Sequence, residues 1–428
     1  MINLKLPLFS WQFQVGGGLM VYRILSLDGG GAWSLIQVNA LIALYDKATP
    51  GHTVLADFDL VAASSGGSLV LGGLVENLKL GDLLGYFEDE KNRKSVFSPT
   101  TSVGDWTLQK LTGLGPRYSA EAKLPGLQRL LPKRGNVALP DAASGVRRAG
   151  ASLDVHLLII GFDYDRNRAT FFRSAPAGTD AAWGKGDIST ITLAEAIHAS
   201  TNAPVNYFDA PAAFPDRPER YWDGGITGCN NPILAAVTEA IVLGQKRTDI
   251  VALSIGTASV ALPWPAPGQA PSPLLQPRTD QSLITDLRKL ATSILDDPPD
   301  IATFLAHVMT GGGDGVPPPA DSRIVRMNPL ICPVKGPGDN WVVPGGMTLA
   351  QFSYLAKLEL DAVEQAQVDA ITAYTEQWLL SKVSNQPIRM NGDTLKLEVG
   401  SNWFQEAVAA WNKIKVGLPK TRKGTAVS

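Results

Sequence analysis

Three short turns rich in small residues contain the side chains best suited to chemistry. They are Asp28–Gly31, Ala63–Gly67 and Asp223–Gly225, and each lies at the predicted carboxyl end of a strand. In an open α/β sheet, the carboxyl ends of the strands border one crevice. The sequence therefore predicts that the three turns lie together and form one site.

The second turn offers a nucleophile. Ser65 stands at a predicted strand-to-helix turn, where Ala63, Gly66 and Gly67 let the strand and the helix approach closely. A serine on such a turn has its hydroxyl exposed above the positive end of the helix. Ser64 is the competing nucleophile, but it occupies the exit of the strand. We therefore predict that Ser65 attacks the substrate.

The other two turns supply what an attacking serine needs. Attack on an ester carbonyl creates an oxyanion, and consecutive glycine N–H groups can converge on one point because no Cβ obstructs them. Gly29, Gly30 and Gly31 are the predicted oxyanion hole. Asp223 stands at a strand end before two glycines, so its carboxylate can approach the serine closely and is the predicted base.

Histidine is scarce, with only four in the chain. In α/β-hydrolases the triad follows the order serine, acid, histidine, and only His307 follows Asp223. His307 stands in an apolar, helix-like stretch, where a structural role is expected. The glycine run also precedes Ser65 by only one βαβ unit. We therefore favour a Ser65–Asp223 dyad and keep an esterase that uses His307 as an alternative.

The same residues also have structural interpretations. In the structural interpretation, Ser65 is simply a small residue that permits a tightly packed turn, and Asp223 is a turn-forming residue before glycines. The glycine run can be a nucleotide-binding turn, but Ser34 stands where the third glycine of that motif is needed. A protein of this fold that binds lipid without cleaving it is the second alternative.

Alternating strands and helices are predicted to position the turns. Val21–Leu27 and Asp59–Ala63 read as buried strands, and an amphipathic helix is expected from about Trp33 to Asp46. A further helix runs through Asn77. Strand, helix, strand, helix implies parallel pairing, so the expected fold class is α/β.

The alternation continues beyond this unit. The expected elements are a hairpin or adjacent strands at Val155–Ile160 and Ala169–Phe172, a helix that starts with a capping box of Thr192 and Glu195, a helix over Pro232–Leu243, a strand over Ile250–Ile255, helical structure over Ala350–Leu380, a strand over Leu395–Val399 and a helix over Trp403–Lys415. Two stretches rich in proline and glycine, Leu262–Pro277 and Gly311–Pro319, are expected to be loops. We hypothesise that one of these loops covers the crevice at Ser65.

In the order and spacing of its motifs, the chain resembles the patatin-like phospholipases. Their DGGG motif matches Asp28–Gly31, their G-x-S-x-G elbow matches Ala63–Gly67, and their D-G-G or D-G-A motif matches Asp223–Gly225. Supporting matches lie at Ala203–Pro204, Tyr207–Phe208, Asn230–Pro232 and Leu253–Thr257. The resemblance implies a Ser–Asp dyad that works through an acyl-enzyme, a three-layer α/β/α fold with a mostly parallel sheet, and phospholipid or other lipid esters as substrates. It implies neither a cofactor nor a metal.

Three positions depart from the family pattern. Ala63 replaces the first glycine of the elbow, and Trp33 and Ser34 stand where the family has an arginine and a glycine after DGGG. The methyl group of Ala63 adds bulk at a crowded turn. The resemblance implies that this arginine orients the glycine loop or binds a head group, and Trp33 can do neither in the same way.

Composition sets further bounds. The chain has 428 residues, of which 45% are hydrophobic and 18% charged, and a net charge of -2, which argues against nucleic acid as a partner. We expect an N-terminal extension over residues 1–20, a hydrolase domain over 21–380, and a C-terminal extension over 381–428 with a helix and a basic tail. Neither a signal peptide nor a membrane-spanning segment is predicted. With only two cysteines, a reducing compartment and a cytoplasmic location are expected. The protein is expected to be soluble or only peripherally attached to a membrane.

Overall fold

The structure is a computed structural model of the chain. It describes residues 21–99, 116–174, 190–205, 207–278, 298–311, 322–391 and 396–416, together with the single residues 280, 282, 286 and 289. The predicted extension over residues 1–20, the basic tail after residue 416 and nearly all of the Gly311–Pro319 loop lie outside the described residues.

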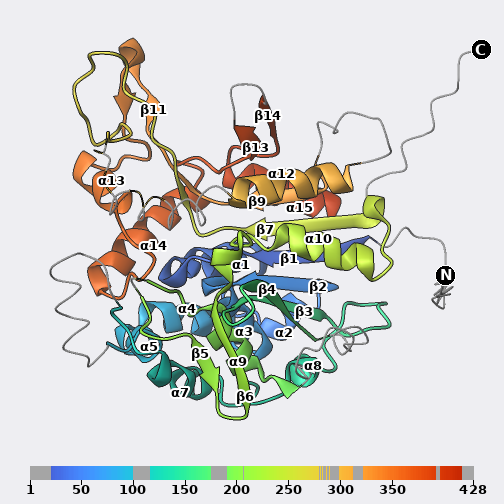
Figure 1. Cartoon of the computed structure of the whole chain (residues 1–428). Helices are drawn as coiled ribbons and strands as arrows, with labels where there is room; N and C mark the ends of the chain where they lie inside the picture. Colours follow the sequence, from blue (N-terminus) through green and yellow to red (C-terminus); the bar gives the residue numbers. More distant parts are fainter. Residues whose placement is uncertain are drawn as a thin grey trace, which may run out of the picture.

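An eight-stranded sheet forms the centre of the fold, with its strands in the order β5-β6-β3-β2-β1-β7-β9 and β4 paired to β3 (Figure 1). The five strands from β3 to β9 in this order are parallel, namely β3 (His156–Asp163), β2 (Leu60–Ser64), β1 (Tyr22–Leu27), β7 (Ile250–Ile255) and β9 (Ile324–Met327). Antiparallel strands complete one side of the sheet: β4 (Arg168–Arg173), β5 (Ala212–Phe214) and β6 (Arg217–Asp223). The predicted mostly parallel α/β sheet is confirmed.

Alternate side chains of the central strands enter two apolar clusters. Ile24 and Leu60 face a cluster that includes helices α10 (Ile233–Val242) and α12 (Pro298–Thr310). Leu25 and Val61 face a larger cluster on the other side of the sheet. Because both faces are covered, these strands read as nearly continuous apolar runs. Figure 1 shows the three layers, with α10 and α12 on one side of the sheet and α3 and α9 on the other.

The larger cluster is covered by several helices. They include α1 (Leu35–Tyr45), α2 (Gly51–Leu55), α3 (Gly66–Val75), α4 (Leu80–Glu88), α5 (Glu90–Val96), α7 (Ala120–Leu130), α8 (Leu139–Ala142), α9 (Leu193–Ser200), α13 (Leu349–Leu355), α14 (Gln365–Leu379) and α15 (Phe404–Ile414). Trp378 and Trp411 are fully buried in this cluster, and Trp411 stacks on Phe58. The C-terminal helices are thus packed against the same apolar cluster as the elbow helix α3.

Three small sheets complete the described secondary structure. They pair β8 (Ser259–Val260) with β10 (Leu330–Ile331), β11 (Val334–Lys335) with β12 (Trp341–Val342), and β13 (Ile388–Asn391) with β14 (Lys396–Val399). Short 3-10 turns lie at Gly31–Ser34, Gly224–Thr227, Arg247–Asp249 and Pro337–Asp339.

Most predicted elements are present, with shifted ends. The capping box of Thr192 and Glu195 starts α9 as expected. The first helix begins at Leu35, because Gly31–Ser34 forms a 3-10 turn beside the glycine loop. The expected helical stretch over Ala350–Leu380 was wrong as one unit, since an irregular segment separates α13 from α14. This segment contacts the predicted oxyanion loop, as described below.

Candidate active site

Ser65 forms the turn between β2 and α3. Its φ is 45° and its ψ is -126°, a backbone conformation that non-glycine residues seldom adopt. The Ser65 N–H donates to Ser200 Oγ at 2.9 Å, and its C=O accepts from the Ser68 hydroxyl at 2.6 Å. These contacts hold the strained turn. The competing serine, Ser64, is fully buried at the end of β2.

The structure brings Ser65 and Asp223 into direct contact. Ser65 Oγ donates to Asp223 Oδ2 at 2.6 Å, within the range expected for a serine and its base. The other carboxylate oxygen, Oδ1, accepts from the Gly225 N–H at 2.7 Å, and the Asp223 N–H donates to the Asn202 carbonyl at 3.0 Å. Both carboxylate oxygens and the backbone of Asp223 are therefore fixed.

Burial raises the pKa of Asp223 to about 6, whereas the hydrogen bonds from Ser65 and Gly225 and the positive charge of Lys123 oppose this rise. At neutral pH the group is therefore mostly a carboxylate that can accept a proton. A pKa close to the working pH favours proton transfer in both directions. This pKa is compatible with the predicted role of Asp223 as a base.

A buried lysine lies close enough to influence this carboxylate. Lys123 on α7 is fully buried, and its ammonium lies 4.0 Å from the centre of the Phe208 ring. Within the described residues, Lys123 Nζ and His198 Nδ1 are buried without a hydrogen-bond partner. Burial lowers the pKa of Lys123, and burial and the charge of Lys123 lower the pKa of His198. Neither residue was predicted as part of the site.

The predicted oxyanion glycines lie beside the elbow, but their amides are not equivalent. The Gly29 N–H donates to the Asn230 carbonyl at 2.8 Å, so it is already engaged. Among the described residues, no acceptor is found for the N–H groups of Gly30 and Gly31. The N–H groups of Gly30 and Gly31 are therefore available to donate to an oxyanion, whereas that of Gly29 is not.

Close packing explains why this loop and the elbow need glycine. A Cβ on Gly66 would collide with Ser34 Oγ and with the backbone of Gly31, and a Cβ on Gly67 would collide with the carbonyls of Leu27 and Asp28. The start of α3 therefore lies directly against the glycine loop. Ala63 is tolerated because it lies within β2, where its methyl group packs into the larger apolar cluster.

Residues far along the chain hold the other side of the glycine loop. The Ala32 N–H donates to the Leu360 carbonyl at 3.0 Å, and Trp33 Nε1 donates to the Glu359 carbonyl at 3.1 Å. Gly31 has a φ of +55°, and a Cβ there would collide with the Leu360 carbonyl. Trp33, which departs from the family pattern, thus joins the loop to the segment between α13 and α14.

The histidine of the alternative triad lies in a different environment. His307 is buried in α12, and its Nδ1 is 2.9 Å from Ser322 Oγ. Ser65 and Asp223 form their hydrogen bond directly, without an intervening ring. The geometry therefore supports a role for the dyad rather than for His307.

An apolar cavity opens one helical turn along α3 from Ser65. Its lining combines Ala32, which follows the glycine loop, with Leu69 and Gly73 on α3. Further lining comes from α4, α5 and α7, including Leu83, Phe87, Val96, Leu127 and Leu131. This lining is suited to an alkyl chain.

The described proline-rich loop borders a different hollow. Residues 262–277 line a cavity together with Ser353, Ala356 and Lys357, and neither Ser65 nor Asp223 contributes to that lining. These contacts do not support the hypothesis that this loop covers the crevice at Ser65. No described helix is long and apolar enough to span a bilayer.

Comparisons with known proteins identify a family for part of the chain. The family model for patatin-like phospholipase matches residues 25–237. A curated Pseudomonas aeruginosa protein named cGAMP-activated phospholipase is 26% identical over 249 residues, which is 57% of this chain and 64% of that protein. The chain thus matches less than two thirds of the length of this relative.

Among solved structures, VipD from Legionella pneumophila is similar over 83% of this chain and 67% of that chain, with 10% identity and a TM-score of 0.32.

The region matched by the family model, residues 25–237, includes all three turns of the site. The central sheet of the whole chain carries helices on both faces, as the family resemblance implies. Residues 25–237 of this chain therefore belong to the patatin-like phospholipase family.

Proposed function

We propose that the protein hydrolyses acyl esters of lipids, in the manner of a phospholipase A or lysophospholipase, with Ser65 and Asp223 as its catalytic dyad. The observation that carries this proposal is the strained elbow of Ser65, with its hydroxyl 2.6 Å from the buried Asp223 carboxylate. A strained backbone that aims a nucleophile at its base is typical of a reaction centre.

In the proposed reaction, Ser65 Oγ attacks the acyl carbonyl carbon while its proton passes to Asp223 Oδ2. The N–H groups of Gly30 and Gly31 donate to the oxyanion. The carbon–oxygen bond to the alcohol then breaks, and the leaving oxygen takes the proton from Asp223. Water then attacks the acyl-enzyme while Asp223 accepts a proton from it. The bond between Ser65 Oγ and the acyl carbon breaks, Asp223 returns the proton to Ser65 Oγ, and the fatty acid is released.

The apolar cavity beside α3 supports a lipid substrate. Its lining is mainly apolar, and the guanidinium of Arg93, its charged member, already donates to Val363, Phe87 and Gln365. Neither Ser65 nor Asp223 lines this cavity, but Ala32 does, and it follows the proposed oxyanion amides. Transfer of an alkyl chain from water into such a lining is favourable by about 0.8 kcal/mol per methylene group. A substrate with a long acyl chain should therefore bind more tightly than a short one.

The experiment is covalent labelling of the wild-type protein with a fluorophosphonate, followed by peptide mapping and by assay of phospholipid and p-nitrophenyl esters. Labelling at Ser65 with ester turnover is expected. A folded protein that binds lipid vesicles without labelling or turnover would instead favour the non-catalytic lipid-binding alternative. Labelling at another serine would contradict the dyad.

A further inference from the structure

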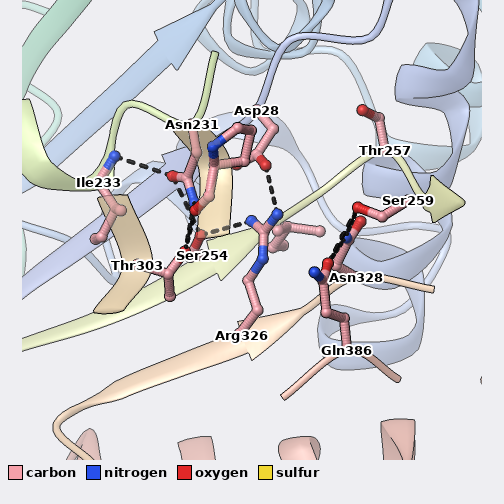
Figure 2. A network of polar contacts seen from close by, with 12 residues as sticks. Asp28, Asn231, Ile233, Ser254, Thr257, Ser259, Thr303, Arg326, Asn328 and Gln386 are labelled. Carbon is pink, nitrogen blue, oxygen red and sulfur yellow. Dashed lines mark hydrogen bonds and ion pairs between the residues drawn. The ribbon is translucent and has the colours of Figure 1, made fainter. Parts of the chain in front are cut away.

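Arg326 is a buried charge on β9, the last strand in the order of the central sheet. It lies in β9, all of whose residues are buried, and its side chain is only 4% exposed. Removing a guanidinium from water is costly unless an opposite charge and hydrogen bonds compensate. Arg326 Nη2 donates to Asp28 Oδ2 at 2.6 Å, and the Asp28 side chain is equally buried (Figure 2).

Asp28 is the residue that leads from β1 into the three glycines. Its N–H donates to the Ile255 carbonyl at 3.1 Å, and its carbonyl accepts from Gln37 Nε2 at 2.9 Å. With the carboxylate held by Arg326, the side chain and both backbone groups of Asp28 are anchored. The direction in which the chain enters the glycine loop is thereby fixed.

The same guanidinium reaches a second anchor of that loop. Arg326 Nη1 donates to Ser254 Oγ at 2.9 Å, and Ser254 Oγ lies 3.5 Å from Asn231 Oδ1. Figure 2 shows these side chains as one connected network. The carbonyl of the preceding residue, Asn230, accepts the Gly29 N–H. Arg326 thus contacts Asp28 directly, and Ser254 links it to Asn231, the neighbour of the residue that accepts the Gly29 N–H.

The packing around the guanidinium leaves little freedom. A Cβ on Gly256 would come within 2.9 Å of Arg326 Nη2, so the glycine at the end of β7 makes room for the ion pair. Burial raises the pKa of Asp28 to about 6, and the charge of Arg326 opposes that rise. The charge of Arg326 therefore favours the ionised form of Asp28.

We propose that Arg326 is a positioning residue for the oxyanion loop, which it holds through Asp28. The inference rests on the proposed function of Ser65 and Asp223. In this chain Trp33 occupies the position at which the family has an arginine after DGGG, and β9 supplies a cation to the loop from outside the matched region 25–237. Arg326 acts through Asp28 and has no direct contact with the reacting atoms.

The test measures catalysis per active site. Arg326→Gln, Asp28→Asn and the double variant are titrated with a fluorophosphonate, and kcat and KM are measured with a soluble ester. Displacement of the loop should lower kcat about 10- to 100-fold, because catalytic geometry tolerates little misplacement. KM should stay within about threefold. Since both changes break the same contact, the double variant should be no slower than the slower single variant.

Arg148→Gln is the matched control. Arg148 forms a comparably buried ion pair with Asp59 at 3.0 Å, at the end of β2 opposite Ser65. This variant should unfold at a lower temperature while keeping its kcat per labelled site. A residue with only a structural role at position 326 would behave in the same way. Wild-type kcat per labelled site in Arg326→Gln would therefore overturn the inference.

Arg326→Lys covers the case in which Arg326→Gln does not fold. Lysine keeps the charge but cannot contact Asp28 and Ser254 through two separate donors of a planar group. A reduced kcat in Arg326→Lys supports the inference, and an unchanged kcat in both Arg326→Lys and Asp28→Asn overturns it. A wild-type protein that is not labelled at Ser65 would overturn the proposed function itself, and the two failures are thus distinguished.

Discussion

Residues 25–237 and the residues that follow them contribute to the same site in different ways. The first region carries the groups that would react: the Ser65 hydroxyl, the Asp223 carboxylate and the loop amides. The second region carries none of these. Its Arg326 guanidinium and Leu360 carbonyl instead hold the glycine loop from two sides.

This difference has a physical cause. A reacting group must have one chemical identity and one local turn, which short motifs encode. A residue that only holds the loop in place needs a hydrogen-bond donor or acceptor at the right position. Any element of the fold that reaches the loop can provide such a group. Substitution of a reacting group should therefore lower activity more than substitution of a residue that holds the loop.

Loss of the nucleophile should have the largest effect. Ser65→Ala removes the attacking oxygen while leaving the apolar packing of the elbow intact, so ester hydrolysis should fall by at least about 10³-fold. Circular dichroism and the thermal midpoint should show a folded protein. Turnover above a few per cent of wild type in such a protein would disprove the role of Ser65.

Displacement of the glycine loop from the second region should have an intermediate effect. In Gly31→Ala the new Cβ would collide with the Leu360 carbonyl, and the residue has a φ of +55°. We expect kcat to fall about 10- to 100-fold. Gly346→Ala is the control, because Gly346 has a φ of +72° and open space around its Cβ position. Equal losses of kcat in both variants would mean that backbone strain alone is responsible.

The charge on the base should set the pH dependence. Since the pKa of Asp223 is raised to about 6 and the carboxylate is the active form, kcat/KM should fall as the pH drops through about 6. Lys123→Met removes a cation that opposes this rise, so the fall should move to higher pH. A pH profile of soluble-ester hydrolysis measures this shift.

Lys91, which is exposed on α5, provides the control for Lys123. Lys91→Met should leave the profile unchanged. Methionine is similar in length to lysine and suits a buried position, so Lys123→Met should still fold, which the thermal midpoint checks. A profile of Lys123→Met that coincides with wild type would show that Lys123 does not influence Asp223.

The sequence could predict those parts of the site that depend on local chain geometry. Ser65 and Asp223 each stand at a strand end beside glycines, and parallel strand order brings such ends together. Arg326 could not be found in this way, because β9 is short and contains no turn motif. A charged residue within an apolar run was its only signal. Leu360 acts through its backbone carbonyl, which no side-chain pattern reveals.

The smallest effect is expected for the histidine of the alternative triad. His307→Asn should leave kcat and its pH dependence unchanged, because the Ser65 hydroxyl contacts Asp223 directly and His307 contacts Ser322 within the layer of α12. Asparagine retains a group that can hydrogen-bond Ser322, so the fold should be preserved. A triad histidine would behave differently, since its loss removes the base and lowers kcat by several orders of magnitude. Comparison of kcat per fluorophosphonate-labelled site in wild type and His307→Asn decides between the two mechanisms, and a large loss would replace the dyad with a triad.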